Sequence, residues 1–228
     1  MAVRKRATKM TTAEKKRFRD VITALIDNGT YGTLVSHHAD MSHNMHGSMG
    51  EVGRERFLPW HRVYLLKMEQ AMQNIDPLAF IPYWNWVTQR RVPHWLNDFM
   101  PTVQVPGVGQ VPVTRNVGFP PPLPSSSHIA DVQSETTYTN YTTALEFAHN
   151  NVHGWVGGTM GSIPTAPADP VFWLHHAQVD RLWSLWQAKA SNTGKNPTLN
   201  GSDRIMDPWP ETAAQVRSIA TLGYSYGS

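Results

Sequence analysis

The stretch TTALEFAHNNVHGW, from Thr142 to Trp155, places His149 and His153 four residues apart in a segment with helical apolar spacing. Residues at positions i and i+4 project from the same face of a helix, so the two imidazoles would face one point. The pair alone is weak evidence, because 11 histidines placed at random among 228 residues give roughly half of one such pair. The other histidines and the pattern of helices must decide whether this segment carries a site.

The composition is that of a globular protein, with 40% hydrophobic and 16% charged residues and a mean hydropathy of −0.39. The length suits one core, and we expect a single domain over residues 1–228. No apolar run of about 18 residues is present and no secretory signal is visible, which favours a cytoplasmic location. The chain contains no cysteine, so any metal must bind through nitrogen or oxygen.

The net charge of +3 is small, and much of it lies in the opening MAVRKRATK. We expect this basic end to be a solvated tail. No later segment alternates basic and aromatic residues, as a nucleic-acid groove would. The sequence therefore argues against nucleic-acid binding.

Apolar periodicity predicts a mainly α fold in which four core helices form a bundle with long irregular loops and few short strands. A helix over 11–29 begins with a Thr11-x-x-Glu14 capping box and ends at Asn28-Gly29. The other predicted helices cover 30–43, 59–76 with Pro59 in the first turn, 142–155, and 170–189 after Asp169-Pro170.

The segments between these helices are predicted to be irregular. Gly47, Gly50 and Gly53 indicate a flexible connection. Residues 89–140 are rich in proline, and only VQVPGVGQVPVT within them could form short strands. Long loops of this kind are usually functional or mobile.

The histidines cluster at the ends and on the faces of the predicted helices, and each of two groups can offer three imidazoles. His38, His43, His46 and His61 form the upstream set, and His149, His153, His175 and His176 the downstream set. Imidazoles without thiolates suit copper or zinc. A structural zinc site needs only four ligands, and a carboxylate-bridged di-iron site needs a second Glu-x-x-His match, which we do not find.

Four motifs in order, RFLPWHRVYLLKMEQAM, IPYWNW, HNNVHGWVGG and DPVFWLHHAQVDRLWSLWQ, resemble the central domain of tyrosinases, which are type-3 copper proteins. The resemblance extends to the final LGYSYG and covers nearly the whole chain. It implies a four-helix bundle that holds two copper ions, each bound by three histidines.

Matched position by position, the resemblance assigns the second copper to His149, His153 and His176, with His175 as a supporting neighbour. For the first copper it assigns His61 and His38, with His37 as the alternative to His38. The middle ligand departs from many relatives, where it stands at the position of Val52. We favour His46 over His43, because Gly47 leaves the backbone free to turn the ring inward.

The resemblance also implies that Asn150 and a nearby glutamate hold a water that helps to deprotonate phenols. Glu146 is the candidate glutamate, and its alternative interpretation is an exposed helix carboxylate.

Structural roles follow for several other residues. The resemblance implies a polar link between Asp180 and Arg181, and a Tyr224-x-Tyr226 motif that closes the domain. Six tryptophans are expected to pack in the core: Trp60, Trp84, Trp86, Trp173, Trp183 and Trp186. The Gly157–Ala168 loop and the proline-rich segment are the expected rim of the pocket.

The resemblance implies an enzyme that uses O2 to hydroxylate monophenols and to oxidise o-diphenols to o-quinones. The alternatives are a catechol or o-aminophenol oxidase without the hydroxylation step, a hemocyanin-like oxygen carrier and a di-zinc hydrolase. Small phenols and a copper-delivery protein are the partners we expect, with no nucleic acid or membrane among them.

Overall fold

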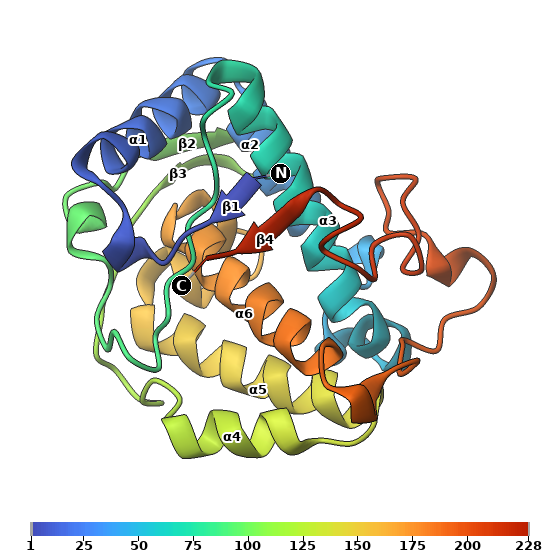
Figure 1. Ribbon diagram of the computed structural model, residues 1–228. Helices are drawn as coiled ribbons and strands as arrows, with labels where there is room; N and C mark the ends of the chain where they lie inside the picture. Colours follow the sequence, from blue (N-terminus) through green and yellow to red (C-terminus); the bar gives the residue numbers. More distant parts are fainter. Residues whose placement is uncertain (1, 228) are drawn as a thin grey trace.

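The computed structural model describes residues 2–227 and is mainly helical, which confirms the predicted fold class (Figure 1). Its α-helices are α1 (Thr12–Asp27), α2 (Thr30–Ala39), α3 (Glu51–Ile75), α4 (Ser126–Ser134), α5 (Tyr138–Val156) and α6 (Val171–Gln187). Strands β1 (Ala2–Arg4) and β4 (Tyr224–Tyr226) pair in parallel, and β2 (Thr102–Val105) and β3 (Gly109–Pro112) form an antiparallel hairpin.

The long helix α3 is the centre of the packing. It contacts α1, α5 and α6, while α5 packs against α6 on one side and α4 on the other (Figure 1). The core between them holds large aromatic side chains, and the prediction of buried tryptophans is confirmed for Trp60, Trp84, Trp86, Trp173, Trp183 and Trp186. None of the helices within residues 2–227 has the length and apolar character needed to cross a membrane.

The first two helices begin as predicted, but the second ends early. Thr11 and Glu14 form both hydrogen bonds of the capping box at the start of α1. Helix α2 stops at Ala39 rather than His43, because the Asp40 carboxylate accepts a hydrogen bond from the Ser42 amide and turns the chain. The segment that carries His46 therefore lies outside any α-helix.

Helix α3 contradicts the predicted start at Pro59, since it begins eight residues earlier at Glu51. Proline has no amide hydrogen, so the carbonyl of Glu55 loses its helical partner. The Tyr138 hydroxyl donates to that carbonyl instead, at 2.9 Å. Gly53, predicted to lie in a flexible connection, is part of this helix.

The region over 89–140 is more ordered than predicted. The expected short strands are confirmed as the β2–β3 hairpin. Helix α4 was missed, although Ser125 caps it by accepting a hydrogen bond from the His128 amide. Helix α5 begins at Tyr138 rather than Thr142, behind a Thr137 cap. Both caps follow the usual preference for a hydroxyl side chain before a helix.

The basic opening is not a solvated tail, because Arg4 is fully buried. Its guanidinium pairs with Glu69 at 2.9 Å and lies 3.5 Å from Asp180. The predicted link between Asp180 and Arg181 is also wrong. The second charged partner of Asp180 is Arg62.

The tyrosines of β4 complete this buried cluster. The hydroxyls of Tyr224 and Tyr226 both donate to Asp180. Arg181 instead lies over the ring of Tyr83, 4.9 Å from its centroid. Burial raises the pKa of Asp180, but the charges of Arg62 and Arg4 outweigh this effect and hold the pKa below its usual value. The carboxylate therefore joins both ends of the chain to α6 as a charged group.

Replacing Asp180 with asparagine should lower the free energy of unfolding by about 3–5 kcal/mol, because two buried guanidiniums lose a shared counter-charge. Urea unfolding of the two proteins measures the difference. Asp20→Asn is the matched control, since Asp20 pairs with Lys16 on the exposed face of α1 and should change stability by less than about 1 kcal/mol. Equal effects of the two substitutions would contradict a structural role for the buried cluster.

Candidate metal centre

The structure gathers histidines into two groups whose ring nitrogens lie within 4.8 Å of one another. The first histidine group is His38 of α2, His61 of α3 and His46 from the segment between these helices. The second histidine group is His149 and His153 of α5 and His176 of α6, with His175 beside them. His46 and His149 face each other across the groups, with ring centroids 6.1 Å apart.

The Nε2 atoms converge at distances that suit a single cation in each group. In the first group, Nε2 of His38 lies 3.3 Å from Nε2 of both His46 and His61. In the second, Nε2 of His176 lies 3.1 Å from that of His149 and 3.4 Å from that of His153. Nitrogen ligands at about 2.0–2.1 Å from a tetrahedral metal are separated by roughly 3.3 Å.

The other ring nitrogen, Nδ1, fixes the tautomer of most of these rings. Three rings donate from Nδ1 to a backbone carbonyl: His38 to Ile163 (2.9 Å), His61 to Phe57 (2.8 Å) and His153 to Met160 (2.7 Å). His46 donates to the carboxylate of Glu146, and His149 to the amide oxygen of Asn150. A proton on Nδ1 leaves a lone pair on Nε2. Lone pairs that face each other at 3.3 Å repel unless a cation lies between them, so the donor set fits copper or zinc.

His175 is oriented differently from its neighbours. The indole N–H of Trp86 donates to its Nδ1 at 3.1 Å, so the neutral ring carries its proton on Nε2 and offers no lone pair there. The ring stacks on His149, with centroids 4.9 Å apart and planes 16° apart. His175 therefore supports the second histidine group, and three of the four imidazoles remain as donors.

The environment keeps these imidazoles neutral. Burial is the largest cause that lowers the pKa of His38, His61, His149, His153, His175 and His176, and neighbouring rings lower most of them further. The pKa of His153 falls to about 4, because burial outweighs its hydrogen bond to Met160. Neutral imidazoles bind a metal without first losing a proton.

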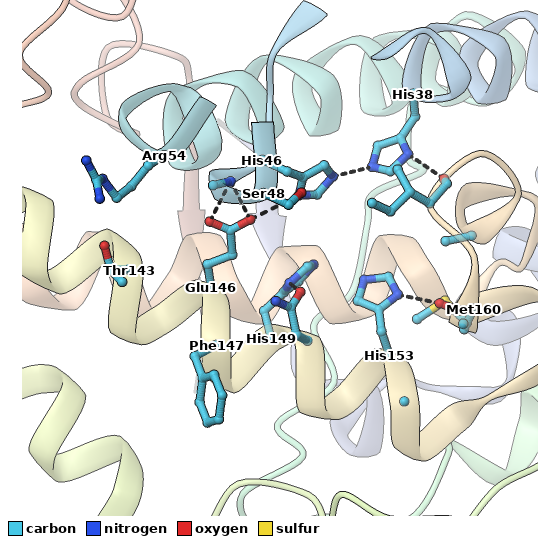
Figure 2. A pocket seen from close by; sticks show the side chains of 16 residues that line it. His38, His46, Ser48, Arg54, Thr143, Glu146, Phe147, His149, His153 and Met160 are labelled. Carbon is cyan, nitrogen blue, oxygen red and sulfur yellow. Dashed lines mark hydrogen bonds and ion pairs between the residues drawn. The ribbon is translucent and has the colours of Figure 1, made fainter. Parts of the chain in front are cut away.

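A cavity of about 590 Å³ opens beside both groups (Figure 2). His38, His46, His149 and His153 line it, together with Glu146, which is buried, and Asn150, which is exposed. Met160, Gly161, Ile163 and Ala166 also line it, so the prediction that the Gly157–Ala168 loop forms part of the rim is confirmed. Residues 89–140, expected at the rim as well, contribute nothing to the lining.

The two alternative ligands lie outside the groups. His37 packs edge-on against Trp209, and His43 stacks on Trp60 with Nε2 3.7 Å from Asp40. His38 and His46 are the members of each pair that the structure brings to His61.

Five cavity residues were missed from the sequence: Gly154 of α5, and Ser48, Arg54, Thr143 and Phe147, which are labelled in Figure 2. Phe147 is 61% exposed next to Glu146, and an apolar side chain on an otherwise polar helix face was the one available signal. The carbonyls that orient the histidines left no sequence signal, because every residue has one.

The chain is similar to known proteins in both sequence and fold. The family model described as the common central domain of tyrosinase matches residues 28–116 and 110–189. Tyrosinase from Streptomyces galbus is 33% identical, covering 99% of both chains. Grixazone synthase from Streptomyces griseus is 29% identical over 82% of this chain and 84% of its own. A functional unit of octopus hemocyanin has the same fold, with a TM-score of 0.73, 22% identity and coverage of 100% of this chain and 68% of its own.

The metal-free protein should lose stability as the pH falls from 7.5 to 5.5. An imidazole in the unfolded chain has a pKa near 6.5, whereas the buried rings have lower values. The unfolded state therefore binds more protons below about pH 6.5, and the folded state is disfavoured. Urea midpoints at the two pH values measure the loss.

His153→Asn should reduce this pH dependence, while His94→Asn, at an exposed position, should retain it. A midpoint that stays constant between pH 7.5 and 5.5 would show that the buried imidazoles take up protons as readily as exposed ones.

Proposed function

Because the chain belongs to the tyrosinase family of type-3 copper proteins, we propose that it uses O2 to hydroxylate monophenols and to oxidise o-diphenols to o-quinones. Six imidazoles in two groups of three, with Nε2 atoms that converge and a cavity of about 590 Å³ beside them, carry this proposal. The relatives named tyrosinase support the same activity.

We propose that His38, His46 and His61 hold one copper ion and that His149, His153 and His176 hold the other. Hydrogen bonds from Nδ1 orient five of these rings before any metal arrives, and His176 is held by stacking on Phe172, so little freedom is lost on binding. Two bound copper ions supply the two-electron redox chemistry that O2 requires. The protein supplies the fixed nitrogen donors and a cavity that admits an aromatic ring.

The substrate must lose its phenolic proton, and the free group has a pKa near 10. Glu146 and Asn150 lie four residues apart on α5, next to His149, and both line the cavity. A carboxylate has about four lone-pair positions, so Glu146 can accept from a water besides its present donors. We propose that a water held by these two residues takes the proton as a general base.

The second candidate is a catechol or o-aminophenol oxidase without hydroxylation. Glu146 already accepts hydrogen bonds from the His46 ring and the Gly47 amide, which leaves less capacity for a water. A catechol binds through two hydroxyls and depends less on such a base. An oxygen carrier is less favoured, because a cavity of this size beside the histidines gives phenols access to them.

Copper analysis combined with O2 uptake tests the function. The copper-loaded protein should contain two ions per chain and consume O2 with both a monophenol and a catechol. Uptake with the catechol alone would support the second candidate. Two bound copper ions without turnover of either substrate would contradict the enzymatic proposal. Bound zinc together with esterase activity would instead indicate a hydrolase.

Asn150→Ala should weaken monophenol hydroxylation by roughly tenfold or more, while catechol oxidation changes much less, since only the monophenol step needs the held water. The ratio of kcat/KM on the two substrates measures this, at equal copper content. Asn151→Ala is the matched control, because Asn151 follows on the same helix without lining the cavity. Equal losses on both substrates would contradict the proposal that Asn150 helps to hold the water that acts as general base.

A further inference from the structure

His46 differs from the other five imidazoles because no helix carries it. It lies between two short 3₁₀ turns, Met41–His43 and Gly47–Met49, with an extended backbone (φ −133°, ψ 147°). The remaining five rings project from α2, α3, α5 and α6. Backbone in a connection of this kind has more freedom than a helix, so something outside the segment must hold the ring in place.

The support comes from Glu146 on α5. Its Oε1 accepts a hydrogen bond from Nδ1 of His46 at 3.2 Å, and its two oxygens lie 2.9 and 3.0 Å from the amide nitrogen of Gly47 (Figure 2). Both residues are buried: Glu146 is 7% exposed and His46 is 4% exposed. The Nδ1 atoms of His38, His61 and His153 donate to backbone carbonyls instead. His46 differs because its partner is a side-chain carboxylate from helix α5.

Two glycines allow the segment to approach this closely. A Cβ on Gly47 would lie 2.8 Å from Oε2 of Glu146, and one on Gly53 would lie 2.1 Å from the carbonyl oxygen of His46. Real Cβ atoms do not come this near to oxygen, so a larger residue would push the segment away. His46 is therefore held between α5 on one side and α3 on the other.

We propose that Glu146 is a positioning residue that builds the first histidine group by fixing His46, so that the helix bearing His149 and His153 also assembles the other copper site. A carboxylate that accepts a hydrogen bond from Nδ1 orients the imidazole and makes Nε2 a more basic ligand for a metal. It also reduces the ordering that metal binding would otherwise require. The inference rests on the copper sites of the proposed function and adds a second role for Glu146 beside the held water.

Copper affinity, measured without substrate, separates this role from proton transfer. Glu146→Ala should bind one copper ion roughly 10- to 100-fold more weakly, as is typical when the partner of a ligating histidine is removed, and the second ion with wild-type affinity. Competition with a chromophoric copper(I) chelator gives both affinities, and elemental analysis gives the number of ions per chain.

Two further variants test the geometry. Glu146→Gln keeps one acceptor oxygen and should show a smaller loss. Gly47→Ala keeps the charge of Glu146 but displaces its carboxylate, so it should weaken the same ion. Glu55→Gln is the matched control: Glu55 is equally buried and holds Thr139 and the Thr198 amide without touching a histidine, so both copper affinities should be retained.

Wild-type affinity for both ions in Glu146→Ala would overturn the proposal, and so would equal weakening of both ions, since that indicates a general loss of structure. A wild-type protein that binds two copper ions and oxidises no phenol would contradict the proposed function alone. The affinities of the variants would still decide the role of Glu146.

Discussion

The position of the proton on each buried imidazole decides which histidines can bind a metal. Each ring can place its proton on either nitrogen, and only a proton on Nδ1 leaves Nε2 free to bind a metal. Backbone carbonyls fix three of the rings, and the side chains of Glu146 and Asn150 fix two more. The indole of Trp86 imposes the opposite tautomer on His175. Hydrogen bonds at Nδ1 therefore decide which imidazoles can act as metal ligands, and they exclude His175.

The bundle keeps these acceptors where the rings need them. The carbonyl of Glu55, freed by Pro59, accepts a hydrogen bond from Tyr138 and joins α3 to the start of α5. The Arg4, Arg62 and Asp180 cluster joins the start and the end of the described chain to α6. Both features bury polar groups, and hydrogen bonds and ion pairs within them offset the cost of burial. The helices that carry the histidines are consequently fixed relative to one another.

Glu146 lies between the first histidine group and the cavity. It lies three residues before His149, lines the cavity and touches the only one of the six ligand candidates that no helix carries, His46. A single carboxylate thereby contacts the first histidine group and faces the cavity. The chain is similar both to proteins named tyrosinase and to one named grixazone synthase.

The family, the helical class and the set of candidate histidines were predicted from the sequence, because motif order and apolar spacing can be found along the chain. The sequence also predicted the capping box at Thr11 and the burial of the tryptophans. The folded structure was needed to show that His46 rather than His43 meets His38 and His61, that Arg4 is buried, and that Asp180 pairs with Arg62 rather than Arg181. Each of these outcomes depends on contacts between residues far apart along the chain or on the path of an irregular segment, and neither leaves a periodic signal in the sequence.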